Sequence, residues 1–147
     1  MSRDSYSEIN LHIVWHTKLS MPLLTPPVEA FVHHHITHRL LAEEDVTVHA
    51  IGGTENHVHV AIGIPPTVLI SELIGRVKGS SAFEANRQFG ATEKVLEWQR
   101  GYGVVSFGTR NLPWVKAYIE NQRAHHARGT LQERLEIAAV PGEKEPV

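Results

Sequence analysis

Strict alternation of apolar and polar positions over residues 55–64 is the clearest pattern in the chain. Branched aliphatic residues point one way, and His57, His59, Ala61 and Gly63 point the other way. A period of two predicts a half-buried β-strand. We therefore expect one face of this strand to enter the core. The other face should carry His57 and His59 about 7 Å apart along the chain.

The remaining elements follow from the same kind of pattern. Residues 7–17 alternate and predict a first strand, and its polar face carries His12 and His16. Gly52 and Gly53 predict a hairpin turn into the histidine strand. Capping residues and a period of 3.6 predict the helices. The other predicted elements are a helix over 25–43, a strand over 46–51, a helix over 67–89, a strand over 98–108, a helix over 111–128 and a short helix opened by a capping box at 130–133.

The order β-α-β-β-α-β-α predicts an α+β protein. We expect a single domain over residues 1–140, with a mainly antiparallel β-sheet and helices packed on one face. The polar residues 141–147 are expected to form a disordered tail.

Composition removes several classes of function. The chain has no cysteine, which excludes a disulfide framework, a thiolate nucleophile and a cysteine zinc site. No apolar run reaches membrane-spanning length and no secretory signal is evident, so we expect a cytoplasmic protein without a membrane partner. The net charge is only −2, but residues 72–134 hold ten Lys and Arg against six Asp and Glu. This basic half of the chain could hold phosphates.

Two pairs of residues are candidates for chemistry. His57 and His59, with small residues beside them, suit a divalent metal that keeps positions free for a substrate. The alternative is a solvated or core-satisfied histidine pair, because a short motif is a weak signal. Tyr118 and Gln122 lie one turn apart on the predicted last helix. They offer a hydroxyl nucleophile and a neutral oxygen ligand, or alternatively a tyrosine at the rim of the core and a surface glutamine.

Five segments, in order, resemble the HUH-type single-tyrosine transposases of the insertion-sequence-200-like family, which includes relatives associated with repetitive extragenic palindromes. The segments are residues 13–18, the His57-Val58-His59 motif, residues 77–81 with a Lys-Gly-x-Ser pattern, residues 98–102 and the Tyr-Ile-x-x-Gln pattern at 118–122. One departure is Asn56, because the family usually has Asp before the first histidine.

The resemblance implies a ferredoxin-like HUH nuclease fold and a transposase that cleaves and rejoins single-stranded DNA at hairpin-marked ends. His57, His59 and Gln122 would hold Mg²⁺ or Mn²⁺, which would polarise the scissile phosphate. Tyr118 would then attack phosphorus to form a 5′-phosphotyrosine, although no general base is evident. The candidate contacts to the DNA backbone are Lys18, Arg76, Lys78, Arg100 and Arg110.

The resemblance also implies a homodimer with shared active sites, in which the Tyr118 helix docks on the histidines of the second chain. Of two alternative functions, one stays open and one is discounted. A domesticated DNA-hairpin-binding protein of the same fold, without transposition, is the alternative function. A histidine-triad nucleotide hydrolase would need a third alternating histidine where Ala61 stands, so we discount it.

Overall fold

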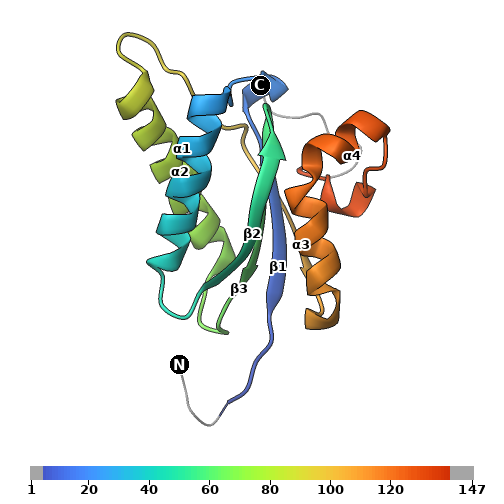
Figure 1. Ribbon diagram of the computed structural model, residues 1–147. Coiled ribbons are helices and arrows are strands. Elements are labelled where there is room, and N and C mark those ends of the chain that lie inside the picture. The colour runs from blue at the N-terminus through green and yellow to red at the C-terminus, as the bar shows by residue number, and fades with distance from the viewer. Residues whose placement is uncertain (1–4, 140–147) are drawn as a thin grey trace.

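Four antiparallel strands form one sheet in the spatial order β2-β3-β1-β4 (Figure 1). The computed structural model describes residues 5–139. The strands are β1 (Asn10–His16), β2 (Thr47–Thr54), β3 (His57–Gly63) and β4 (Gly103–Phe107). The predicted α+β class and the antiparallel sheet are confirmed. Strands β1 and β3, which carry His12, His16, His57 and His59, are neighbours at the centre of the sheet.

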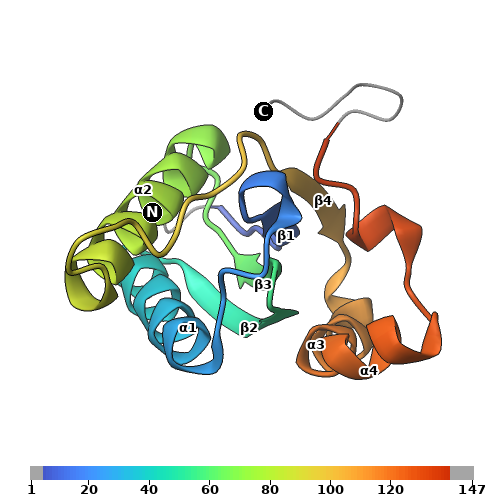
Figure 2. The ribbon, with the colours of Figure 1, turned by 90° about the horizontal axis from the view of Figure 1, so that it is seen from above.

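Helices cover both faces of this sheet, so the prediction that they pack on one face is wrong. Helices α1 (Pro26–Leu41) and α2 (Ile70–Phe89) lie on one side, and α3 (Leu112–Glu120) and α4 (Gln122–Arg128) lie on the other (Figure 2). The second face needs a cover because it also carries apolar residues. Its small buried cluster consists of Ala50, Ala61, Val115 and Ile119.

Small residues on the sheet let α3 approach closely. A Cβ atom added to Gly52 of β2 would lie 2.2 Å from the backbone oxygen of Ile119 in α3. Gly52 therefore fixes how near the last helices can come to the histidine-bearing face.

The predicted hairpin into the histidine strand is observed, but the predicted turn at Gly52 and Gly53 is wrong. Both glycines lie inside β2, paired with His59 and Val58, and the turn falls at residues 55–56.

Several predicted boundaries differ from the observed ones. The predicted helix over 111–128 is interrupted at Asn121 (φ −111°, ψ 27°), which separates α3 from α4. Helix α2 begins at Ile70. The predicted capping box at 130–133 is wrong: the short helix is a single 3₁₀ turn, Glu133–Leu135, whose N-cap makes no side-chain capping hydrogen bond. Gly129 ends α4 with a left-handed φ of 67°, as predicted. The predicted disordered tail, 141–147, lies outside the described residues.

The main apolar core lies between the sheet and helices α1 and α2. Alternate residues of β1 and β3 supply its sheet side: Leu11, Ile13, Trp15, Val58, Val60 and Ile62. The helices supply buried aliphatic residues that include Val32, Ile36, Leu73, Ile74 and Val77. Within residues 5–139, no helix is both long enough and apolar enough to cross a membrane.

Candidate active site

The polar face of the sheet brings histidines of β1 and β3 together. His16 stands directly opposite His57 in the antiparallel register. His12 Nε2 lies 2.8 Å from His59 Nδ1, and both side chains are buried. The polar faces of β1 and β3 therefore lie side by side, beneath α3 and α4.

His57 is oriented by two neighbours at its Nδ1 atom. The side-chain oxygen of Asn56 lies 2.7 Å from Nδ1, and Thr54 Oγ1 lies 2.9 Å from it. Because an amide oxygen only accepts, the ring proton lies on Nδ1 and the lone pair of Nε2 points into the site. Burial, together with the neighbouring His59, lowers the pKa of His57 to about 3. This imidazole is therefore neutral and available as a ligand at neutral pH.

His59 presents a buried nitrogen whose hydrogen bonding is incomplete. Its Nδ1 contacts His12, but within residues 5–139 its Nε2 makes no hydrogen bond. Glu136 Oε1 lies 3.2 Å from that Nε2. Buried polar atoms without a hydrogen bond are uncommon, so this nitrogen is a candidate ligand atom.

Helix α4 brings two more side chains to the Nε2 atom of His57. Gln122 Oε1 lies 3.2 Å from it, and His126 Nε2 lies 3.1 Å from it. Gln122 is buried, whereas His126 is at the exposed edge of the site. His126 is not among the site residues predicted from the sequence. Its position four residues after Gln122, the same spacing that separates Tyr118 from Gln122, is a signal that could have indicated it.

Glu136 completes the cluster from the segment that follows the last 3₁₀ turn. Its Oε1 lies 3.6 Å from His57 Nε2 and 3.7 Å from His126 Nε2. Ligand atoms of His57, His126 and Glu136 all lie within 4.8 Å of one another, so this group could hold a metal ion. No periodic pattern marks Glu136 in the sequence, and only the path of the chain after α4 brings it here.

Tyr118 lies on α3 beside these groups. Its hydroxyl donates a hydrogen bond to Glu136 Oε2 and accepts one from the backbone N–H of Gln132 at 2.9 Å. The ring centroids of Tyr118 and His59 are 6.2 Å apart. The Tyr118 helix therefore lies on the histidines of its own chain, and these groups meet without a second chain.

The pKa values of Tyr118 and Glu136 are shifted in opposite directions. Burial, followed by the hydrogen bond to Glu136, raises the pKa of Tyr118 to about 12. Burial alone would raise the pKa of Glu136, but its interactions with His59, Tyr118 and His57 lower it to about 2. At neutral pH the site thus contains a protonated phenol that donates to an ionised carboxylate.

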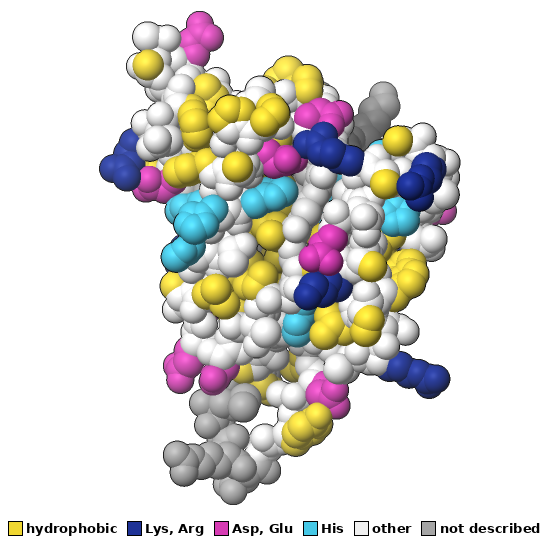
Figure 3. Space-filling model, in the orientation of Figure 1, with side chains coloured by type: hydrophobic (Ala, Val, Ile, Leu, Met, Phe, Trp, Pro, Cys, Tyr) yellow, Lys and Arg dark blue, Asp and Glu magenta, His cyan; other side chains and the backbone are white. Residues whose placement is uncertain are grey.

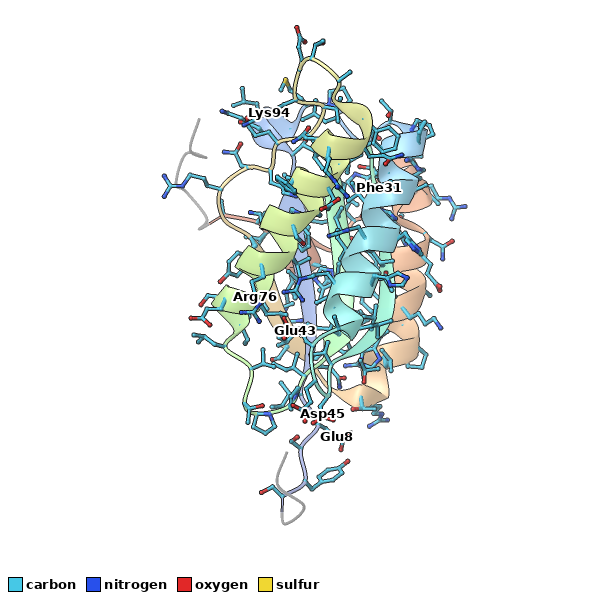
Figure 4. All side chains as sticks on the ribbon, turned by 90° about the vertical axis from the view of Figure 1, so that its left-hand side faces the viewer. Glu8, Phe31, Glu43, Asp45, Arg76 and Lys94 are labelled. Atoms are coloured by element: carbon cyan, nitrogen blue, oxygen red, sulfur yellow. The ribbon has the colours of Figure 1, made fainter. Side chains whose placement is uncertain are left out.

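Within residues 5–139, partners are seen for Lys18, Arg76 and Lys78 among the predicted DNA contacts. Lys78 Nζ donates to the backbone oxygens of Gln99 at 2.8 Å and Gly101 at 2.7 Å, and burial lowers its pKa to about 8. This lysine joins α2 to the segment before β4. The other two pairs are Arg76 with Glu43 at 3.0 Å (Figure 4) and Lys18 with Glu97 at 2.7 Å.

The other two predicted contacts, Arg100 and Arg110, are exposed. On the face drawn in Figure 3, Lys and Arg side chains are scattered among acidic ones and form no continuous basic patch. The electrostatic attraction for a phosphate backbone on this face is therefore local and not spread over the surface.

Fold and site together define an α+β protein with a histidine-rich candidate metal centre beside a buried tyrosine. The chain belongs to the IS200-like transposase family, because the family model described as "Transposase IS200 like" matches residues 5–122. The transposases for insertion sequence element IS200 of Salmonella typhimurium (strain LT2) and Salmonella typhi are each 32% identical to it over 71 residues. That match covers 46% of this chain and 46% of each relative, so the chain spans about half the length of these relatives.

Solved structures share the fold. A crystal structure of a protein from Deinococcus radiodurans R1, proposed to be a transposase, has a TM-score of 0.65 at 21% identity and covers 83% of this chain and 96% of its own. A REP-associated tyrosine transposase bound to a REP hairpin has a TM-score of 0.59 at 14% identity, over 98% of this chain and 94% of its own.

Proposed function

We propose that this chain is a transposase that cleaves and rejoins single-stranded DNA at hairpin-marked ends through a 5′-phosphotyrosine. The observation that carries the proposal is the position of the Tyr118 hydroxyl. It lies within one buried site together with His57, His59 and Gln122. Membership of the IS200-like family supports the reaction, and the hairpin bound to a structural neighbour supports the kind of DNA.

The donor atoms of the site fit a divalent cation. His57, His59 and Gln122 would hold Mg²⁺ or Mn²⁺, with His126 and Glu136 beside them. Imidazole nitrogens, an amide oxygen and a carboxylate are a ligand set that suits Mn²⁺ and is compatible with Mg²⁺. When bound, the cation would polarise the scissile phosphate and stabilise the charge that develops on its non-bridging oxygens.

Tyr118 supplies both the nucleophile and its proton, and Glu136 accepts that proton. The Tyr118 oxygen bonds to phosphorus as the bond from phosphorus to the 3′ oxygen breaks, and the phenol proton passes to the Glu136 carboxylate that already accepts its hydrogen bond. The departing 3′ oxygen then takes up a proton and leaves as a 3′-OH. The phosphodiester is kept as an ester of Tyr118, so rejoining needs no nucleotide cofactor.

We sort the candidate DNA contacts by the contacts that each side chain makes within the chain. We assign Arg100 and Arg110, both exposed, to phosphate contacts. Lys18 and Arg76 would reach DNA by exchanging a surface carboxylate for a phosphate. Lys78 supports the strand that follows Gly101.

We retain the homodimer in the proposal. Each chain of the dimer would build a complete active site from its own Tyr118 and its own histidines. Sedimentation with and without hairpin DNA measures the association. Mixing His57→Ala chains with Tyr118→Phe chains tests the sharing. The mixture is expected to remain inactive, because each variant lacks one part of its own site, whereas recovered activity would indicate sites built from two chains.

The test of the function is covalent capture of DNA. The full chain is incubated with Mn²⁺ or Mg²⁺ and an oligonucleotide that carries an imperfect palindrome from DNA flanking its own gene. Wild type should give a protein–DNA adduct on a denaturing gel, and Tyr118→Phe should give none. Tyr102→Phe, on a half-buried ring packed against the main core, is the matched control and should keep the adduct. An adduct in Tyr118→Phe, or cutting by wild type without an adduct, contradicts the proposal.

The second candidate is a hairpin-binding protein of the same fold that does not transpose. One observation favours it: the raised pKa of Tyr118, about 12, keeps the hydroxyl protonated against Glu136. The same gel decides between the two functions. Tight hairpin binding by wild type without cleavage under any divalent metal would support the binding protein.

A further inference from the structure

An open groove runs along the outer side of α3 and α4, next to Tyr118 but outside the cluster of candidate ligands. Its volume is about 400 Å³. One strip of helix surface lines it: Trp114, Ala117, Tyr118, Asn121, Ala124, His125 and Arg128. Ala117 and Ala124 are small, so the groove has room between its two ends. A volume of this size falls within the range of pockets that hold small organic ligands.

Three rings are stacked in series along this groove. The centroids of Trp114 and Tyr118 are 5.5 Å apart with planes inclined by 19°, and those of Tyr118 and His125 are 4.7 Å apart at 28°. The central ring is buried at 2% exposure, whereas Trp114 is 52% exposed. The series therefore ends at a large aromatic ring that is open to solvent, one ring away from the proposed nucleophile.

We propose that this groove binds one unpaired nucleobase next to the phosphate that Tyr118 attacks, with the base stacked on Trp114. The proposal rests on the function proposed above, which brings a single strand to Tyr118. Stacking on an exposed aromatic ring is the general way in which proteins hold single-stranded bases, and it tolerates any base because every base has a π-face.

The charge at the far end of the groove fits the same occupant. Arg128 is exposed there, and His125 adds a ring nitrogen donor or acceptor beside it. A cationic side chain near an aromatic platform suits a nucleotide, whose phosphate is anionic and whose base is planar. A base pair in a duplex has both faces covered by its neighbours, so the groove favours the single-stranded flank of a hairpin.

The experiment measures binding of the full chain to the hairpin-bearing oligonucleotide, with an abasic site placed in turn at each position of the single-stranded flank. Wild type should lose affinity by about 5- to 150-fold at one position, which corresponds to the stacking of one base. Trp114→Ala should lose a similar factor on the intact oligonucleotide and should be insensitive to that abasic site. Trp114→Phe keeps a ring and should restore part of the sensitivity.

Phe83→Ala is the matched control. Phe83 is an aromatic residue of α2 with 66% exposure, remote from the groove, and its loss should leave the affinity and the abasic sensitivity unchanged. The proposal is overturned if Trp114→Ala binds the intact oligonucleotide as wild type does, or if it keeps the full abasic sensitivity. Adduct formation is read separately. A missing adduct counts against the proposed function, while a missing abasic effect counts against the groove.

Discussion

The two faces of the sheet are built from the same strands and differ in the polarity of their side chains and in the size of the apolar cluster that covers them. Toward α1 and α2, strands β1 and β3 present only apolar side chains to a large core. Toward α3 and α4, the same strands present His12, His57 and His59, each 1% exposed or less. Among residues 5–139, the buried apolar cluster on that side is small: Ala50, Ala61, Val115 and Ile119, with Phe107 packed against it.

This difference separates stability from chemistry within one sheet. Apolar burial on the α1–α2 face stabilises the fold in proportion to its area. On the α3–α4 face, burial lowers the pKa of both His12 and His57 to about 3, so these two histidines are held neutral, and burying their polar rings costs free energy. A fold can bear that cost when the opposite face supplies enough apolar contact.

The largest effect on stability should come from the apolar face. Ile62→Ala removes a fully buried side chain of β3 and should lower the free energy of unfolding by about 2–5 kcal/mol. Mn²⁺ binding per folded molecule should stay unchanged, since Ile62 points away from the site. Urea unfolding and calorimetric titration measure the two quantities. A selective loss of Mn²⁺ binding would contradict the claim that one face supplies stability and the other supplies the metal site.

A smaller loss of stability is expected on the opposite face from Gly52→Ala. The new Cβ would lie 2.2 Å from Ile119 O, so α3 must move, at a cost of about 1–3 kcal/mol. Because α3 carries Tyr118, adduct formation should fall more steeply than stability. Gly75→Ala in α2 is the control: its Cβ would meet no atom within 4 Å, and the change should be neutral or stabilising. Equal behaviour of the two variants would contradict the close approach of α3.

The polar face should also make stability depend on pH. The pKa of His12 is about 3 in the folded state and 6.5 when unfolded, so the unfolded chain binds more protons below pH 6.5. Stability is therefore lost as pH falls from 6.5, and His12 should contribute about 2 kcal/mol to the loss between pH 7 and pH 5. His12→Asn should show a fall that is smaller by this amount. If the free energy of unfolding, measured with urea, depends on pH equally in wild type and in His12→Asn, then His12 is not held neutral.

The smallest expected effect concerns the residue that orients His57. Asn56→Asp places a carboxylate against His57 Nδ1, where the amide oxygen now lies at 2.7 Å. A charged acceptor makes the opposite nitrogen a better ligand, so Mn²⁺ affinity should rise by up to about tenfold. Calorimetric titration measures the change. Weaker binding in Asn56→Asp would contradict the proposed orientation of His57.

Much of this architecture could be predicted because alternation is a local signal. The period of two in residues 55–64 placed His57 and His59 on the face opposite Val58 and Val60, as observed. Helical spacing likewise placed Tyr118 one turn from Gln122, and both lie in the site. The first feature depends only on the repeat of one strand. The second holds although a break at Asn121 places Tyr118 on α3 and Gln122 on α4.

What could not be predicted depends on contacts between distant segments. Glu136 reaches Tyr118 only because the chain folds back after α4. Lys78 looks like a phosphate ligand in sequence, and its burial against the carbonyl oxygens of Gln99 and Gly101 appears only in three dimensions. The position of α3 and α4 on the second face follows from the small residues Ala50, Gly52 and Ala61, a weak signal in any single strand.

The central claim is that the polar face of β3 is a metal centre, and Mn²⁺ titration followed by calorimetry or electron paramagnetic resonance tests it most directly. Wild type should bind Mn²⁺, and the double variant His57→Ala, His59→Ala should lose that binding. The matched control is His34→Ala with His38→Ala, an exposed pair on α1 whose ring centroids are 4.4 Å apart, and it should bind as wild type does. Mn²⁺ binding that survives in the β3 double variant would contradict the account.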